Sequence, residues 1–186
     1  MQRSLLCTSL GVALLLSALP AIAAAEDLTK PTKQHADMAH EVGVWDAEVT
    51  IWMDPDAEPQ KSKAVESNKM LGKMWLMSKF EGEFGGEKFV GASATGYDPI
   101  KKKYVGGWVD SMSPFMSKME GEYDEDSETL TMMGEGIDCM TGKSMKSKLV
   151  TTYEGDDKKT FEMYRQADGG EDKWTKMMEA KYTRRK

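Results

Sequence analysis

The residue types that most often carry metal or acid–base chemistry are scarce in this chain of 186 residues. Its two histidines, His35 and His40, lie five positions apart in a segment that is typical of a short helix. Two metal ligands on one helix face are three or four positions apart, so these side chains point in different directions. The sequence therefore predicts surface or capping roles for both histidines, with no metal site and no recognisable catalytic group.

Sulfur is concentrated in methionine, with sixteen methionines against two cysteines. Clustered thioethers can bind Cu(I). Methionines three positions apart on a strand, however, lie on opposite faces of the sheet. We expect the methionines either to form a soft lining for an apolar ligand or to fill the core, with copper binding or oxidant scavenging as a further alternative.

Several charged side chains share a predicted strand face with large apolar residues. Asp110 follows Trp108 at a spacing of two, and Arg165 follows Met163 in the same way. Charges that face inward must be paired or solvated. We therefore expect Asp110 to pair with Arg165 or Lys176, either as a structural ion pair or as the polar anchor of a pocket. The candidate ligand-binding residues are Tyr97, Tyr104, Trp108, Asp110, Met132, Met163, Arg165 and Lys176.

The elements that must position these residues are β-strands. Between Trp45 and Ile51, apolar and polar residues alternate, which is typical of a half-buried strand. The alternation recurs to the end of the chain and is interrupted by turn sequences such as Gly85-Gly86 and Asp98-Pro99. Further strands are predicted near residues 61–70, 73–84, 87–97, 103–112, 115–125, 129–138, 143–154, 158–167 and 173–184. The segment 34–42 is predicted to be a short helix with one apolar stripe.

Short turns make consecutive strands antiparallel neighbours. A long meander with one apolar face protects its edges by closing into a barrel or by folding into a sandwich. One layer of large apolar side chains and one layer of Lys, Glu and Thr favour the barrel. The fold class that we predict is all-β: a single antiparallel up-and-down barrel of about ten strands, preceded by the short helix.

The first 25 residues resemble a secretory signal peptide, with Arg3 near the start, an apolar run over 5–19 and small residues before position 26. We predict a flexible arm over 26–33 and a barrel domain over 34–186. Export to the periplasm or the extracellular space would follow, with no membrane anchor after cleavage and with Cys139 as the one remaining thiol. The net charge of −6 argues against nucleic acid as a partner.

The segment Gly43-Val44-Trp45, placed after a short helix, resembles the start of the lipocalins and calycins. In those proteins the tryptophan closes one end of the barrel. The resemblance implies that a basic residue of the last strand, here Arg184, packs over Trp45 through a cation–π contact.

A closer resemblance covers almost the whole chain after the predicted signal peptide. The segments that carry it are Gly43-Val44-Trp45-Asp46, Met70-Leu71-Gly72-Lys73, Phe89-Val90-Gly91, Gly96-Tyr97-Asp98, Trp108-Val109-Asp110-Ser111-Met112, Phe161-Glu162-Met163 and Glu179-Ala180-Lys181-Tyr182. In these segments the chain is similar to the domain of unknown function 1579 family, which is bacterial, has an expected calycin-like fold and has no established activity. The resemblance therefore implies the barrel but no mechanism.

The sequence favours a binding protein over an enzyme, and no cofactor is expected. The leading hypothesis is that a small apolar or amphipathic molecule binds inside the barrel. The main alternative is a cell-envelope interaction protein whose barrel is filled by its own side chains. A hydrolase or isomerase that uses Asp110 and a tyrosine is a third hypothesis.

Overall fold

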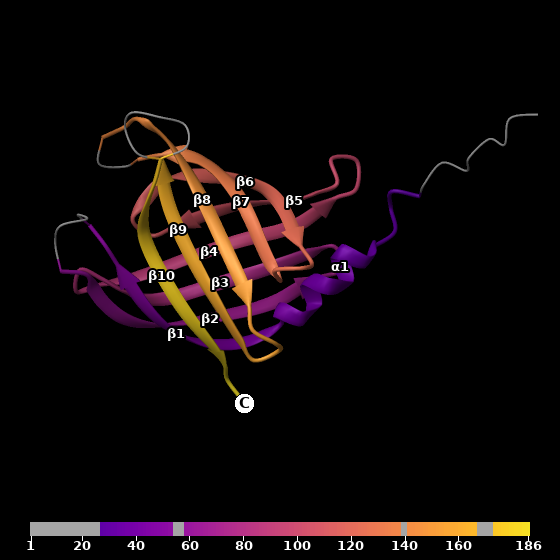
Figure 1. The fold of residues 1–186 in the computed structure, drawn as a ribbon, viewed down its shortest axis with the longest axis horizontal. Helices are drawn as coiled ribbons and strands as arrows, with labels where there is room; N and C mark the ends of the chain where they lie inside the picture. Colours follow the sequence, from indigo (N-terminus) through magenta and orange to yellow (C-terminus); the bar gives the residue numbers. More distant parts are fainter. Residues whose placement is uncertain (1–26, 54–57, 139–140, 167–172) are drawn as a thin grey trace, which may run out of the picture.

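The computed structural model describes residues 27–53, 58–138, 141–166 and 173–186, so the predicted signal peptide and Cys139 lie outside the described residues (Figure 1). A short helix α1 (Lys33–Asp37) continues into a 3-10 helix η1 (Met38–Glu41). Ten strands follow: β1 (Gly43–Ile51), β2 (Gln60–Leu71), β3 (Trp75–Phe84), β4 (Glu87–Asp98), β5 (Lys103–Asp110), β6 (Ser113–Asp124), β7 (Thr129–Ile137), β8 (Ser144–Tyr153), β9 (Lys158–Gln166) and β10 (Trp174–Arg184).

The strands form a closed antiparallel up-and-down barrel, in which each strand pairs with its neighbours in the sequence and β1 pairs with β10. The closing ladder runs from the Trp45–Arg184 pair to the Ile51–Met178 pair. The predicted meander of ten strands is confirmed. The predicted helix over 34–42 is present as α1 and η1 together.

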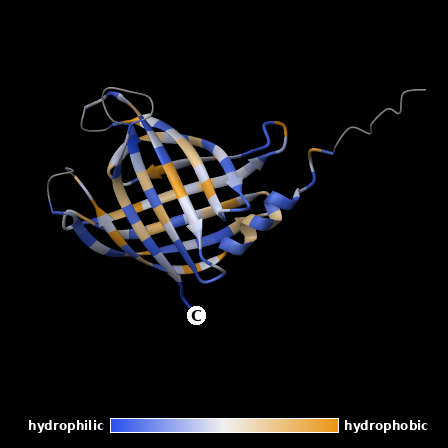
Figure 2. Ribbon diagram, in the orientation of Figure 1, coloured by the Kyte–Doolittle hydropathy of each residue, from blue (hydrophilic) through white to orange (hydrophobic). Residues whose placement is uncertain are grey.

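Alternation along the strands separates an inner face from an outer face, as the hydropathy stripes in Figure 2 show. On β1, the side chains of Trp45, Ala47 and Val49 are buried, whereas Asp46 and Glu48 are exposed. The register places each inward residue opposite another inward residue on the neighbouring strand. The face of any residue can therefore be followed around the barrel.

The two ends of the barrel differ. At one end, which we call the helix end, α1 and η1 lie against the strands (Figure 1), and the buried Met38 packs with Leu76, Tyr104 and Met132. At the other end, which we call the far end, the described residues form only turns between strands. In the described part of the chain, no helix is long and apolar enough to span a bilayer.

One irregularity in β10 changes which residues face inward. The register between β9 and β10 shifts between Lys176 and Met178, which is a β-bulge. Met178 pairs with the inward Met163, whereas Lys176 pairs with the outward Tyr164. The prediction that Lys176 faces inward, as a partner of Asp110, is therefore wrong, because the extra residue of the bulge reverses the alternation.

Candidate functional site

The half of the barrel interior that lies toward the far end, which we call the far lumen, contains inward side chains that are only partly buried. Met132 pairs with Leu149, Leu149 with Met163, and Met163 with Met178, so these four residues form a row across the inner wall. The row starts at Met132 and Leu149, which pack in the Met38 cluster of the helix end, and it reaches the far lumen at Met163. Met132 is buried, but the other three are half-buried. Because they face the inside of a closed barrel, their exposed surface faces the lumen.

Trp108 lies along the wall of the far lumen instead of crossing it. A Cβ atom on Gly91 of the neighbouring strand would lie 2.2 Å from the Trp108 ring, so only glycine leaves room for this position. The ring is stacked near Phe89 with a centroid distance of 6.4 Å and an interplanar angle of 18°. The indole Nε1 of Trp108 donates a hydrogen bond to Asp110 Oδ2 at 3.0 Å, which fixes the orientation of the ring.

Hydroxyl groups accompany the apolar side chains of the far lumen. The inward Trp108 pairs with Ser93 on one side and Ser117 on the other, and all three residues are half-buried. Ser147 also faces inward. It packs closely against Gly134, where an added Cβ atom would lie only 2.4 Å from the Ser147 Oγ. The far lumen therefore offers both apolar and hydrogen-bonding surface, as pockets for amphipathic molecules do.

The predicted ion pair between Asp110 and a cation across the lumen is wrong. Asp110 accepts hydrogen bonds from Trp108 and from the backbone N–H of Met112 at 2.9 Å. Arg165 is exposed near the far end, where it forms a salt bridge with Asp138 at 3.1 Å. Each charge is satisfied close to its own strand, so no bond across the lumen is needed.

Lys176 belongs to a cluster on the outer surface. Its ammonium group forms salt bridges with Glu162 and with Glu179, the latter at 3.2 Å. It also lies 5.8 Å from the ring centroid of Tyr164 and 6.0 Å from that of Trp52. The structure therefore separates Lys176 from the other predicted ligand-binding residues.

Tyr97, Tyr104 and Met132 pack below the helix end of the barrel. The rings of Tyr97 and Tyr104 meet edge to face at 5.3 Å, and the ring of the buried His35 lies 5.9 Å from Tyr97. Burial raises the pKa of Tyr104 to about 12. The structure brings together only Trp108, Asp110 and Met163 on the inner wall of the far lumen, with Arg165 near its rim.

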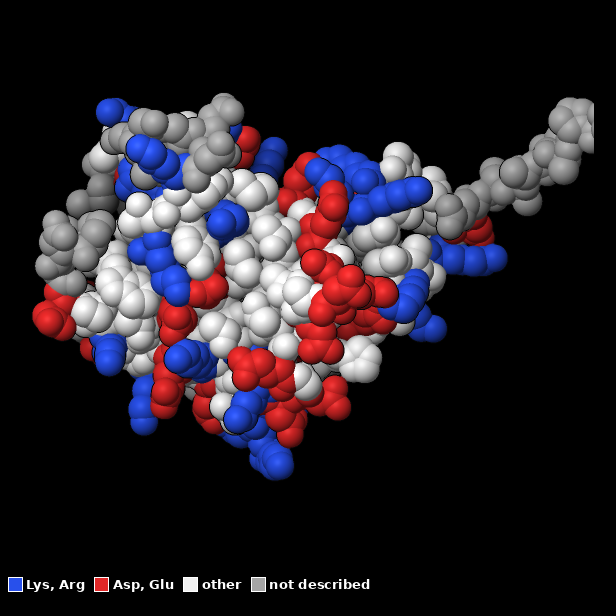
Figure 3. Space-filling model, viewed as in Figure 1, with Lys and Arg blue, Asp and Glu red and all other residues white. Residues whose placement is uncertain are grey.

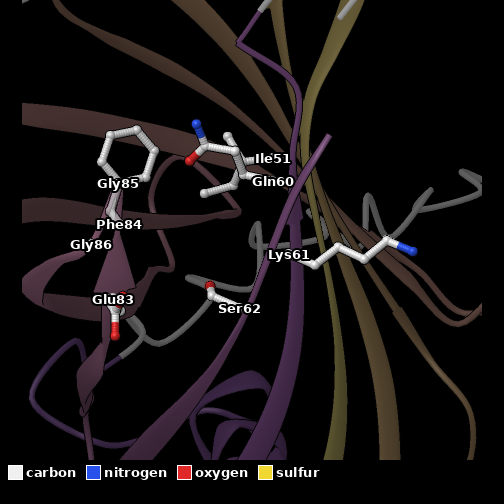
Figure 4. Close-up of a pocket in the computed structure, with 8 residues that line it drawn as sticks. All are labelled: Ile51, Gln60, Lys61, Ser62, Glu83, Phe84, Gly85 and Gly86. Carbon is white, nitrogen blue, oxygen red and sulfur yellow. The ribbon is translucent and has the colours of Figure 1, made fainter. Parts of the chain in front are cut away.

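A notch in the barrel wall lies beside the far lumen, between β2 and the turn that joins β3 to β4 (Figure 4). The ladder between β2 and β3 ends at the Val65–Glu81 pair, so the strand segments beyond it are not paired with each other. The notch has a volume of about 440 Å³. In Figure 4 the side chains of Ile51, Gln60 and Phe84 lie near one another, whereas Lys61 points away from them.

Trp45 is the most deeply buried large side chain of the helix end, with 2% of its surface exposed. The guanidinium carbon of Arg184 lies 4.1 Å from the Trp45 ring centroid, which is the contact that the resemblance implies. Arg184 also donates hydrogen bonds to the carbonyl oxygens of Val42 and His40, both at 2.6 Å. These hydrogen bonds hold the end of the last strand against η1 and the residue that follows it.

A buried polar cluster next to Trp45 was not predicted from the sequence. Lys159 of β9 forms salt bridges with Glu41 of η1 and with Glu66 of β2, the latter at 2.9 Å. Burial alone would lower the pKa of Lys159, but attraction to Glu66 and Glu41 outweighs it and raises the pKa. Lys159 follows the inward alternation of Phe161 and Met163, and this signal could have revealed it.

Asn68 extends this cluster. Its side-chain Nδ2 donates to Glu66 Oε1 at 2.8 Å, and its Oδ1 is a buried acceptor without a hydrogen-bond partner among the described residues. Burial, together with Glu66, also raises the pKa of Tyr182 far above its usual value. The cluster therefore joins η1, β2, β9 and β10 by polar contacts inside the barrel.

The histidines have structural positions. Thr32 donates from its backbone N–H to His35 Nδ1 at 3.0 Å at the start of α1, whereas His40 is exposed. Among the described residues, no group of three or more His, Cys, Asp or Glu side chains is placed to hold a metal ion.

The fold defines a class: a closed, ten-stranded, antiparallel up-and-down barrel. Residues 30–184 match the family described as "Protein of unknown function (DUF1579)", and the chain belongs to this family.

Comparison with one solved structure supports the fold. The crystal structure of Rv2717c from M. tuberculosis is similar with a TM-score of 0.61 at 9% sequence identity, covering 84% of this chain and 100% of that one. A redesigned β-barrel matches with a TM-score of 0.43 at 13% identity, covering 80% of this chain and 94% of that one. No match is found among curated proteins.

Proposed function

We propose that this protein is exported and that it binds a small apolar or amphipathic molecule in the far lumen, without catalysing a reaction. The observation that carries the proposal is the partial exposure of inward side chains, such as Leu149 and Met163, inside a closed barrel. A barrel filled by its own side chains would bury this row completely. Ten strands also enclose a wider interior than the eight of the smallest barrels.

The chemistry of the wall supports an amphipathic ligand. Trp108 and Met163 offer apolar surface, while Ser93, Ser117 and Ser147 offer hydroxyl groups that can donate or accept hydrogen bonds. Methionine suits a lining that must adapt to several ligand shapes. The notch beside β2, with a volume of about 440 Å³, lies at the same end of the barrel.

The test is to fill the far lumen and measure binding of a defined probe. The probe is 11-(dansylamino)undecanoic acid, whose emission rises when it leaves water for an apolar site. We expect the wild-type protein to bind it and Ser147→Phe to bind it at least about tenfold more weakly, because the new ring projects into the lumen.

The matched control is Lys146→Phe, which adds the same ring to the adjacent, outward-facing and exposed position of β8. It should bind the probe like the wild type. Equal affinity of the two variants, or no binding by the wild type, would contradict the proposal. The second result would favour a packed barrel that acts through its surface.

A further inference from the structure

The turn between β5 and β6 lacks charge in a chain that is otherwise rich in it. Charged residues make up 30% of the sequence, yet none occurs over residues 111–117. The neighbouring Asp110 is already hydrogen-bonded to Trp108 and to Met112. This hairpin tip can therefore move from water into an apolar medium without burying an unpaired charge.

Large apolar side chains cover this tip. Met116 is 60% exposed, Val109 42%, Phe115 41% and Met112 39%. Such a concentration of exposed apolar surface is characteristic of an interaction site. The other hairpin whose turn is fully described at the far end, which joins β3 to β4, carries Glu83, Glu87 and Lys88 instead.

The apolar side chains are distributed around the tip. Val109 and Met116 are on the outer face of the barrel, where Met116 lies next to Gly107, whereas Phe115 has the alternation of the inner face and Met112 lies in the turn. A protrusion with apolar groups on several sides is best surrounded by a fluid medium. A bilayer provides such surroundings.

Cations lie behind the tip. Lys118 is exposed on the outer face of β6, two residues after Met116, and the exposed Lys143 and Lys146 belong to the neighbouring hairpin of β7 and β8. The exposed Glu135 of β7 pairs with both Lys118 and Lys146, so this surface carries three lysines against one carboxylate of the strand between them. Figure 3 shows several blue side chains near the grey atoms at the upper left, at the far end of the barrel. Apolar groups ahead of lysines complement the acyl chains and anionic headgroups of a bilayer surface.

We propose that the β5–β6 hairpin tip, residues 109–116, inserts into the surface of an anionic lipid bilayer and holds the far end of the barrel against it. The attachment is peripheral and requires no spanning segment. It does not depend on occupancy of the lumen. If both proposals hold, an amphipathic molecule can pass between the bilayer and the lumen with little exposure to water.

The experiment measures flotation of the protein with vesicles of phosphatidylglycerol and phosphatidylethanolamine. The full chain is expressed in a bacterial host, and mass spectrometry identifies the N-terminus of the purified form. We expect the wild type to float with the vesicles. In the double variant Met112→Ser/Met116→Ser, the partition coefficient should fall at least about tenfold, because two exposed apolar groups are lost from the tip.

The control is Leu71→Ser/Ile100→Ser. These side chains are 62% and 76% exposed, but they lie in or beside turns at the helix end. This variant should float like the wild type, and both variants should keep the wild-type melting temperature.

The proposal fails if the wild type does not float, if the Met112/Met116 variant floats like the wild type, or if both variants lose flotation equally. Self-association or binding to another protein without flotation would also overturn it. Probe binding in the lumen is measured on the same proteins, so failure of this proposal is distinguishable from failure of the ligand-binding proposal.

Discussion

The helix end and the far lumen are built on the same strands but use their inward side chains differently. Around Trp45, the side chains are buried, each charge has a partner, and η1 contributes Glu41 from outside the sheet. Around Trp108, many of the inward residues are glycine or serine, and the large side chains lie along the wall of the barrel. The inward side chains around Trp45 are thus buried more completely than those around Trp108.

Removing the two tryptophans separately should give the largest contrast. Trp45→Ala should lower the free energy of unfolding by about 3–5 kcal/mol, because it empties a fully buried site. Trp108→Ala should cost less, about 2 kcal/mol, because that ring packs against the core cluster but is only half-buried. Denaturant unfolding measures both values. Equal losses would contradict a division into a stabilising end and a binding end.

Breaking one ion pair in the buried cluster at the helix end and one on the outer surface should sharpen the contrast. Lys159→Met leaves Glu41 and Glu66 buried without their cation, which should cost about 3–5 kcal/mol. The loss should shrink on acidification, because protonation removes the stranded charges. Lys176→Met, on the outer surface, should cost less than about 1 kcal/mol. Thermal melts at several pH values test this, and equal losses in the two variants would show that the buried cluster is not a stabilising element.

The smallest expected effect concerns Tyr104. Its pKa is raised to about 12 in the folded state, whereas an unfolded chain releases a phenolic proton near pH 10. The folded state therefore holds the proton longer, and stability must fall as the pH rises through this window. Tyr104→Phe should make the fall in melting temperature less steep, but not abolish it, because burial also raises the pKa of Tyr182. An unchanged slope would mean that Tyr104 titrates as an exposed phenol does.

Most of the fold could be predicted from the sequence because period-two alternation and turn residues are local signals. The contact of Arg184 with Trp45 was predicted only through the family resemblance, because no local sequence pattern relates residues so far apart. No sequence pattern marks the bulge before Met178. Because of this bulge, Lys176 faces outward, whereas the alternation predicted that it faces inward. For Asp110, a hydrogen bond to a residue two positions away replaced the predicted long-range ion pair.

The site was only partly predictable for a related reason. Alternation identifies which face a residue occupies, but it does not distinguish the two ends of the barrel. Tyr104 and Trp108 share one strand face, yet one is buried beneath the helix end and the other lines the far lumen. Only the packing of α1 and η1 separates them.

The pairing of β1 with β10 also sets the order of events during folding. The seam joins Trp45 to Arg184, so it cannot form until nearly the whole described chain has been synthesised. Contacts so distant in sequence form slowly. Until then the first strand lacks one of its two partner strands, and the barrel stays open along this seam.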